Sequence, residues 1–529
     1  MKKFDTLSVL LETSSGITPK PETVKRFIKI ISEMGYDRLY LGMADAYKIE
    51  GEPYFGYKRG GYTKRDFKEM DEFAKDCGVE LVPQIQLLGH LHYLKKFPCY
   101  TELFDTEDTL IVGEERVYEL IEKMIKTVSE GLSSRTIHIG LDETFGLGTG
   151  NYLKNHPPKD KKELIIEHID RVQKILDKYG YKSVKAWGDM LTEKGDFKYS
   201  PQEVKERLPK NMSVVVWNYE EKSEEKLFGL IDEGRKVSDR VEFAGAVWKY
   251  LGFGPNNAFS ADCILSQMKS CFKHGVKDYI VTLWADAIAP CSNFAALPSL
   301  YAAAEYANGT IESLCDIDKD RFRKTAGIGY DELYALEYLD NPFKESCTTR
   351  SSSSVWALYS DVLLGNFDTL IPKNADQAYM KLASEYKNSF GGEYGYIFRM
   401  SAALCETLAV RSDISARIRD AYAAKDISAM REIVPRVEKL KSKLKEFTDE
   451  FKNYYFHDNM SFGIEVYHIR LGGLIQRAEY TQERLNAFIN NGERIEELEG
   501  GILPLGYDPV PTISCSIMTD PKMLVSYCI

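Results

Sequence analysis

The stretch TIHIGLDETFGLGTG, residues 136–150, places two adjacent carboxylates, Asp142 and Glu143, between a strand-like apolar run and a glycine-rich turn. Two interpretations are open. Asp is a favoured helix N-cap residue, so the pair can simply mark the start of a loop or helix. Alternatively, the two acids form a catalytic pair. Successive strand residues point to opposite faces, so this second interpretation requires the strand to end at Asp142 and the chain to bend there.

Seven more strand-like runs occur in the first 290 residues, with helical patterns between them. The eight expected strands cover residues 6–12, 38–43, 80–86, 136–142, 183–189, 213–219, 243–248 and 279–286. Strands that are apolar throughout and alternate with helices are typical of a parallel sheet covered on both faces. An open doubly wound sheet would carry a phosphate-binding glycine turn after its first strand, and ETSSGITP is not such a turn. We therefore predict an α/β fold that begins with a (β/α)8 TIM barrel.

The chain has 529 residues, which is too long for one ordinary domain. After the serine-rich segment SCTTRSSSSVW, long helical patterns replace the strand-like runs. One of them has apolar residues at alternating steps of four and three, typical of a helix-packing seam: Ile433, Val437, Leu440, Leu444, Phe447 and Phe451. We predict a barrel over residues 1–340 and a mainly α-helical domain over residues 345–529, with a short irregular or strand-like tail.

Composition excludes several classes of partner. The net charge is −11 and the pI is near 5.5, without a basic run, so nucleic acid and anionic membranes are not expected to bind. The N-terminal segment lacks the pattern of a signal peptide, and no apolar run reaches membrane-spanning length. The ten cysteines contain no CxxC pair, which favours reduced thiols and a cytoplasmic location.

Seven of the eight expected strand ends carry polar or aromatic groups. They are Glu12, Gln86 with His90, Asp142 with Glu143, Trp187 with Asp189, Trp217 with Tyr219, Trp248, and Trp284 with Asp286. Barrel enzymes assemble their active sites at these ends. One Trp there is usually core packing, but four of the chain's five tryptophans occupy such places. This arrangement indicates an aromatic box around a ring-shaped ligand.

A metal site is a further alternative, because His90, His92 and His138 could join Asp142 as ligands of a barrel metallohydrolase. Such enzymes usually carry a His-x-His pair at the end of the first strand, and this chain does not. His138 lies inside an expected buried strand, so we interpret it as a core histidine. We expect no metal and no cofactor.

The hexapeptide HIGLDE resembles the His-x-Gly-x-Asp-Glu motif of glycoside hydrolase family 20, the β-N-acetylhexosaminidases. Further segments resemble the family in the same order: YFGYKRGGYTKRDFKEM, PQIQLLGHL, LDETFGLGTGNYL, WGDM, VVWNY and LWAD. The later segment FGIEVYHIRLGGLIQR resembles the helical domain of an intracellular-type branch. The resemblance covers most of the chain.

This resemblance implies an exo-acting, retaining hydrolase of terminal β-linked GlcNAc or GalNAc. In the family, the substrate's own 2-acetamido oxygen attacks the anomeric carbon and gives an oxazolinium intermediate. By the motif, Glu143 would be the general acid and then the base, while Asp142 would orient the acetamido group and stabilise its positive charge. His90 would support the acid, and Tyr219 would donate a hydrogen bond to the acetamido oxygen.

The resemblance also implies the residues that surround the sugar. Trp187, Trp217 and Trp248 would form the wall around the acetamido methyl group. Trp284 would be the platform under the sugar ring, and Asp286 would bind its O4 and O6 side. The expected partner is a small glycan or glycoconjugate, and the oligomeric state, a homodimer included, is left open.

The chain departs from the family at two positions. Members usually carry an arginine after the first strand that binds O3 and O4 of the sugar, where this chain has Ser15 in TSSGIT. After the second strand, Ala44 precedes Asp45 where the related branch has an acidic pair. Two alternatives follow: a relative that acts on a modified hexosaminide, and a carbohydrate-binding pseudoenzyme. The intact Asp142–Glu143 pair argues against the second, since a lectin needs no acid there.

Overall fold

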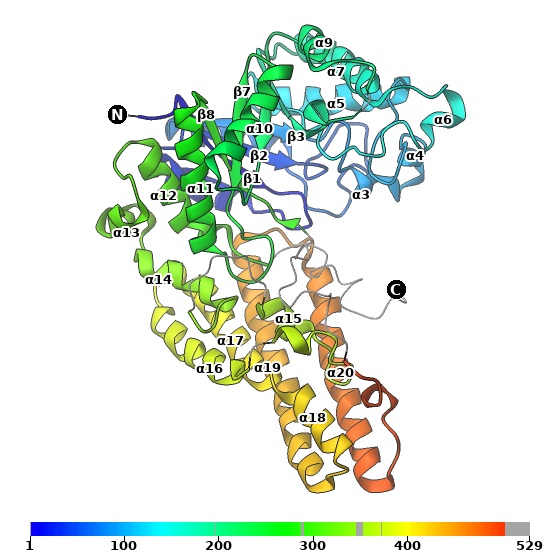
Figure 1. The fold of residues 1–529 in the computed structure, drawn as a ribbon, viewed down its shortest axis with the longest axis vertical. Helices are drawn as coiled ribbons and strands as arrows, with labels where there is room; N and C mark the ends of the chain where they lie inside the picture. Colours follow the sequence, from blue (N-terminus) through cyan, green and yellow to red (C-terminus); the bar gives the residue numbers. More distant parts are fainter. Residues whose placement is uncertain (1, 196, 287–289, 345–352, 372, 503–529) are drawn as a thin grey trace. The chain divides into compact units, whose positions relative to one another are not determined.

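The computed structural model describes residues 2–195, 197–286, 290–344, 353–371 and 373–502, which form two compact units (Figure 1). The first, here called the barrel unit, comprises Met1–Val247, Ser260–Trp284 and Ser299–Asp318. The second, the helical unit, comprises Trp248–Phe259, Ala285–Pro298 and Lys319–Ile529. The helical unit therefore includes the two loops that follow the last two strands. The domain limits expected from the sequence stay a prediction.

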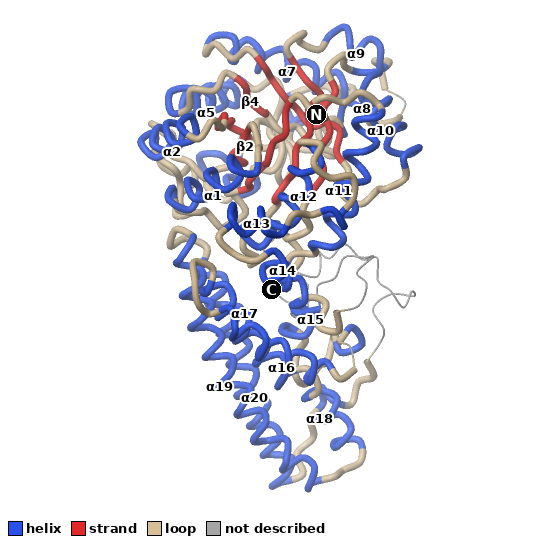
Figure 2. The backbone as a smooth tube through the Cα atoms, turned by 90° about the vertical axis from the view of Figure 1, so that its left-hand side faces the viewer, coloured by secondary structure: helices blue, strands red, loops and turns tan. Residues whose placement is uncertain are grey.

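Eight parallel strands close into a barrel in sequence order, which confirms the predicted TIM barrel. They are β1 (Thr6–Glu12), β2 (Arg38–Met43), β3 (Glu80–Ile85), β4 (Thr136–His138), β5 (Ser183–Trp187), β6 (Met212–Trp217), β7 (Val241–Ala246) and β8 (Asp278–Leu283). The barrel closes where Thr6 of β1 pairs with Asp278 of β8. Successive residues in the middle of these strands are buried. One side chain points into the barrel and the next points outward, where helices cover the sheet (Figure 2).

Helices alternate with the strands around the barrel. The longer ones are α1 (Pro21–Met34), α2 (Lys64–Asp76), α5 (Glu115–Gly131), α7 (Lys161–Lys178), α9 (Pro201–Arg207), α10 (Glu224–Val237), α11 (Asn257–Lys273) and α12 (Leu297–Ala307). Helix α1 shows why they form. Its first turn carries Pro21 and Glu22, its apolar stripe is buried against the sheet, and Gly35 ends it in the left-handed conformation, with φ 97°.

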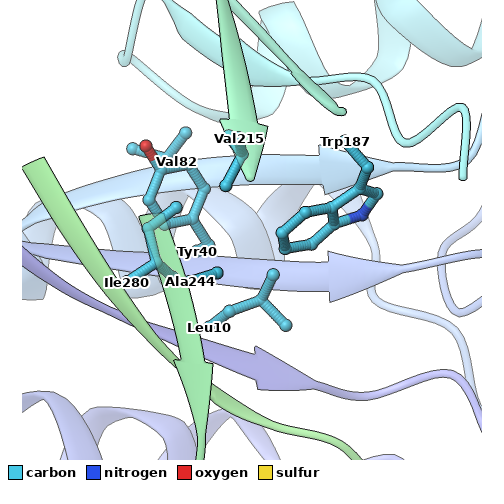
Figure 3. Close-up of a cluster of buried hydrophobic side chains, with 7 residues drawn as sticks. All are labelled: Leu10, Tyr40, Val82, Trp187, Val215, Ala244 and Ile280. Carbon is cyan, nitrogen blue, oxygen red and sulfur yellow. The ribbon is translucent and has the colours of Figure 1, made fainter. Parts of the chain in front are cut away.

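A cluster of buried side chains fills the barrel interior (Figure 3). Its members are Leu10, Tyr40, Val82, Trp187, Val215, Ala244 and Ile280. Trp187 lies nearer the arrowheads of the strands than Tyr40 does, so it closes the core at the carboxyl end of the barrel. Trp217 and Trp284 are partly buried and pack against the same cluster. The core therefore extends to the carboxyl end of the barrel, where Asp142 and Glu143 lie.

Strand β4 is shorter than predicted, because it ends at His138 rather than at Asp142. The reason is local backbone geometry: Gly140 and Leu141 have φ of 72° and 80°, in the left-handed region that strands do not use. At Gly140 the positive φ favours glycine, and a Cβ there would force the amide group of Gln86 to move. The two acids are thus held by a turn beyond the strand.

The helical unit contains α13 (Lys319–Ala326), α14 (Tyr330–Tyr334), α15 (Ser353–Tyr359), α16 (Ala375–Tyr386), α17 (Gly395–Arg411), α18 (Ile414–Ala423), α19 (Ile427–Asp458) and α20 (Ile464–Asn491). Helix α19 packs against α17 and α20, and all six residues of the predicted seam are buried. This confirms a helical region after the barrel. The serine-rich segment and the expected tail lie largely outside the described residues. None of the helices described is both long and apolar enough to cross a membrane.

Candidate active site

The turn after β4 brings three ionisable side chains together. His90, in the loop after β3, places its Nε2 3.2 Å from Asp142 Oδ2 and 3.8 Å from Glu143 Oε2. His90 and Glu143 both adopt left-handed backbone conformations, with φ of 56° and 54°. Such conformations are uncommon for residues other than glycine and are kept only where the surrounding structure enforces them. The chain therefore bends before the two acids, as the catalytic interpretation required, and β4 ends four residues earlier than expected.

The surroundings of Glu143 and His90 shift the pKa values of both side chains. Burial raises the pKa of the Glu143 carboxyl above its usual value, and the charges of Asp142 and Asp189 act in the same direction, against the opposing effect of His90. Burial lowers the pKa of His90, but its ion pair with Asp142 outweighs this and raises the pKa to about 9. At neutral pH the site therefore holds an imidazolium beside Asp142 and a carboxyl that keeps its proton more readily than an ordinary glutamate. This suits a general acid.

Asp189 fixes the position of the acid. Its Oδ2 accepts a hydrogen bond from the backbone N–H of Glu143 at 2.9 Å, and its Oδ1 accepts one from Trp217 Nε1 at 3.4 Å. It is the first residue of the short helix α8 (Asp189–Thr192), directly after β5. Sequence analysis left Asp189 among the strand-end residues without a role. The structure assigns it as the link between the acid-bearing turn and the aromatic wall.

The glycine-rich stretch after the acid wraps around another carboxylate, Asp105. This side chain is buried and accepts hydrogen bonds from the backbone N–H groups of Gly148 at 2.6 Å, Gly150 at 3.0 Å and Tyr152 at 2.8 Å. At Gly150, a Cβ would overlap the backbone oxygen of Asp105. The glycines thus permit close approach to Asp105. Sequence analysis missed this residue, because nothing in the chain connects it with a loop more than 40 residues later.

Three of the four predicted tryptophans converge in the barrel unit. The rings of Trp187 and Trp284 lie 5.8 Å apart, and Trp217 stacks on Tyr219 at 5.2 Å with 25° between the planes. Trp187 is almost completely buried, whereas Trp217, Tyr219 and Trp284 are half-buried. The half-buried rings can therefore present a face to a ligand, while Trp187 belongs to the buried core against which Trp217 and Trp284 pack.

The remaining two predicted sugar-binding residues belong to the helical unit. There Trp248 is buried and stacks on Tyr250, with ring centroids 5.0 Å apart, and meets the edge of Phe259. Asp286 is half-buried and is followed by residues outside the described part of the chain. Their assignment to the sugar pocket stays a prediction.

His138 has the role expected of a core histidine. It is completely buried, its Nδ1 accepts a hydrogen bond from the backbone N–H of Gly140 at 3.1 Å, and its ring lies 4.4 Å from that of Trp187. Burial lowers its pKa to about 3, so it is neutral. Among the described residues, no group of three or more His, Cys, Asp or Glu side chains is arranged to hold a metal ion.

The region around Ser15 is occupied by a short polar network. Ser15 donates a hydrogen bond to Glu12, at the end of β1. Arg59, which the sequence places in YKRGGY, donates to the backbone oxygen of Ser14 and forms an ion pair with the buried Asp45 at 2.7 Å. Arg59 therefore brings a guanidinium within one residue of the position at which the family's arginine is missing.

Comparison with known proteins adds an independent line of evidence. The model described as "Glycosyl hydrolase family 20, catalytic domain" matches residues 20–238, and the model described as "Glycoside Hydrolase 20C C-terminal domain" matches residues 331–514. A probable beta-hexosaminidase from Arthroderma benhamiae is 27% identical over 30% of this chain and 29% of its own length. Hexosaminidase D from Bos taurus is 24% identical over 39% of this chain and 60% of its own length.

The matched region thus spans less than two thirds of these curated relatives. The crystal structure of the chitobiase from Flavobacterium johnsoniae covers 94% of this chain and 74% of its own, with 14% identity and a TM-score of 0.46. The two family models together match most of the chain, and one of them includes the whole acid-bearing turn and its histidine. This chain belongs to glycoside hydrolase family 20.

Proposed function

We propose that the protein is an exo-acting, retaining β-N-acetylhexosaminidase that removes terminal β-linked GlcNAc or GalNAc from a small glycan or glycoconjugate. The observation that carries this proposal is the group formed by His90, Asp142 and Glu143, in which burial favours the protonated form of Glu143. Membership of the family supports the substrate class. Hydrolysis of chromogenic β-GlcNAc and β-GalNAc glycosides tests it directly.

The proposed reaction has two steps. In the first, the bond between C1 and the leaving oxygen breaks, the leaving oxygen takes the proton of Glu143, and the substrate's acetamido oxygen bonds to C1. This gives a cyclic oxazolinium ion. In the second step, water attacks C1, the Glu143 carboxylate takes a proton from it, and the ring opens. Two displacements at the same carbon give net retention.

The site supplies a partner for each charge that develops. The carboxylate of Asp142 faces the acetamido N–H and stabilises the positive oxazolinium, and the ion pair with His90 holds this side chain in position. Tyr219 donates a hydrogen bond to the acetamido oxygen, and its stack on Trp217 holds the phenol in place. Three further roles complete this proposal. Trp248 is part of the wall around the acetamido methyl group, Trp284 is the platform under the sugar ring, and Asp286 binds the O4 and O6 side.

Catalysis by the substrate's own acetamido group predicts strict dependence on that group. Aryl β-glucosides, which lack it, are expected to be nearly inert, whereas aryl β-N-acetylglucosaminides turn over. A thiazoline analogue of GlcNAc is expected to inhibit competitively and far more tightly than GlcNAc, because it resembles the cyclised intermediate. Kinetics on the matched pair of aryl glycosides measure this. Comparable turnover of both would mean that a protein group, rather than the acetamido oxygen, is the nucleophile.

The serine at position 15 predicts weak discrimination between epimers. An arginine fork bonded to O3 and O4 would contribute about 1.5–3 kcal/mol, and serine is too short to replace it. We therefore expect β-GlcNAc and β-GalNAc substrates to have kcat/KM values within about tenfold of each other. Ser15→Arg is expected to increase the preference for one epimer about tenfold.

The exposed Ser442 on α19 provides a matched control as Ser442→Arg, which should leave the ratio of the two epimers unchanged. A strong gluco preference in the wild type that Ser15→Arg does not alter would show that Ser15 is not at the sugar. In that case Arg59, which is hydrogen-bonded to Ser14, would be the residue that binds O3 and O4 of the sugar.

A further inference from the structure

Two exposed tyrosine rings and one half-buried phenylalanine ring cluster on two loops of the barrel unit. Tyr54 and Tyr57 lie between β2 and α2, and Phe97 lies between the short helices α3 (His92–Lys95) and α4 (Pro98–Thr101). The Phe97 centroid lies 5.4 Å from that of Tyr54 and 6.1 Å from that of Tyr57, and the two tyrosine rings are 5.9 Å apart. Tyr54 is 47% exposed and Tyr57 45%. We call these three rings the aromatic platform.

A rigid base holds the aromatic platform. Phe55, between the two exposed tyrosines, is buried and packs on Tyr47 with ring centroids 5.0 Å apart. Gly56 lies so close to the backbone of Asp45 that a Cβ there would overlap its carbonyl oxygen. Tyr62 closes the loop through backbone hydrogen bonds with Ala46 and Lys48. Tyr54 and Tyr57 are therefore exposed although their loop is tightly packed, which favours a binding surface over an incidental exposure.

The aromatic platform also lies at the catalytic end of the barrel. Both of its loops follow the carboxyl ends of strands, on the side toward which the arrowheads of β2 and β3 point and on which α3 and α4 lie (Figure 1). Arg59, two residues after Tyr57, stacks on Tyr93 with its guanidinium carbon 3.6 Å from the ring centroid and bonds to the backbone of Ser14. A continuous set of contacts thus leads from the platform to the end of β1.

We propose that the aromatic platform binds the sugar rings that follow the terminal residue in a glycan chain. The inference rests on the proposed function and extends it from the terminal sugar to the rest of the substrate. Aromatic faces bind the apolar C–H faces of pyranose rings, and the phenol hydroxyls can bond the sugar hydroxyls at the edge. The ring planes meet at 66° and 84°, so Tyr57 forms a step against its two neighbours rather than a flat apolar face. A stepped surface of this kind suits successive tilted sugar rings.

The test measures binding in a Glu143→Gln background, so that hydrolysis of the probes is slow compared with a titration. The probes are GlcNAc, the β1,4-linked GlcNAc trimer and the trisaccharide GlcNAcβ1,3Galβ1,4Glc, each titrated by calorimetry. At least one trisaccharide is expected to bind about tenfold more tightly than GlcNAc, and Tyr54→Ala with Tyr57→Ala is expected to remove that advantage. Tyr54→Phe with Tyr57→Phe should keep most of it, because the rings remain. Phe272→Ala, at an equally exposed ring on α11, is the matched control and should keep all of it.

Two binding results would overturn the inference. One is that neither trisaccharide binds more tightly than GlcNAc, and the other is that the double alanine variant keeps the advantage. If sedimentation shows instead that the double alanine variant loses self-association, the platform is a contact between copies of this chain, and the inference is also wrong. Failure of the proposed function is seen separately, as absence of turnover by wild-type protein on aryl hexosaminides, because the binding test does not depend on turnover.

Discussion

Glu143→Gln is expected to lower kcat/KM by about three orders of magnitude on substrates with sugar or alkyl leaving groups, and far less on nitrophenyl glycosides. A poor leaving group needs a proton as the C1–O bond breaks, whereas a nitrophenolate leaves readily without one. The glutamine keeps the size of the side chain but has no proton to transfer. Kinetics on a series of aryl and sugar leaving groups, compared between wild type and variant, measure this effect.

The pH profile gives a second measurement of the same role. Burial raises the pKa of Glu143, so wild-type kcat/KM should fall on the alkaline side at a pH above that of an ordinary carboxyl, as Glu143 loses its proton. In Glu143→Gln this limb should be absent for substrates that still react. Glu22→Gln, at an exposed carboxylate on α1, serves as the control. An equal loss on good and poor leaving groups would remove Glu143 from the acid role.

The barrel could be predicted from the sequence because its signal is local and repeated. Each strand is an apolar run bounded by turn residues, and helix α1 has the expected stripe of Val24, Phe27, Ile28 and Ile31 on its buried side. The end of β4 was predicted wrongly because apolar residues continue past it. Ile139 and Leu141 are buried like strand residues, yet Leu141 has a positive φ, which side-chain pattern does not reveal.

The site could be predicted only as far as its motif reaches. The motif brings in Asp142 and Glu143, and the segment LGHL brings in His90, which the structure places beside both acids. Asp189 and Asp105 both accept hydrogen bonds from backbone N–H groups of the acid-bearing turn or the loop after it, and any residue can supply such a donor. The sequence therefore indicated Asp189 only as a strand-end residue and did not indicate Asp105, and the bonding partners of both are seen only in the structure.

Arg59 shows a different limit. The sequence places an arginine 44 residues after the vacancy at Ser15, and nothing in the spacing indicates that the two positions meet. The structure brings them together because β1 and β2 are neighbours in the barrel and Asp45, just after β2, holds the guanidinium. A guanidinium from the loop after the next strand thus lies beside the vacancy, which a motif comparison made position by position does not detect.

Asp142→Asn is expected to lower kcat/KM by two or more orders of magnitude on all β-N-acetylhexosaminides, whatever the leaving group. Asparagine keeps the shape of the side chain and can still bond to the acetamido N–H, but it has no negative charge to stabilise the oxazolinium. The loss should therefore appear mainly in kcat. Affinity for a thiazoline inhibitor, whose charge resembles that of the intermediate, should fall in parallel.

The pKa of His90, which lies beside Asp142, distinguishes this electrostatic role of Asp142 from a capping role. In the wild type, burial lowers the pKa of His90, but the ion pair with Asp142 outweighs it and raises the pKa from its usual 6.5 to about 9. The ion pair therefore stabilises the folded protein fully below pH 6.5, and this stabilisation is lost as the pH rises through 9. Asp142→Asn should lower the pKa of His90, as measured by NMR titration, and the thermal stability of the variant should approach that of the wild type above pH 9. A helix or loop cap would leave the histidine unchanged. An unaltered His90 pKa together with near-normal turnover would return Asp142 to the capping interpretation.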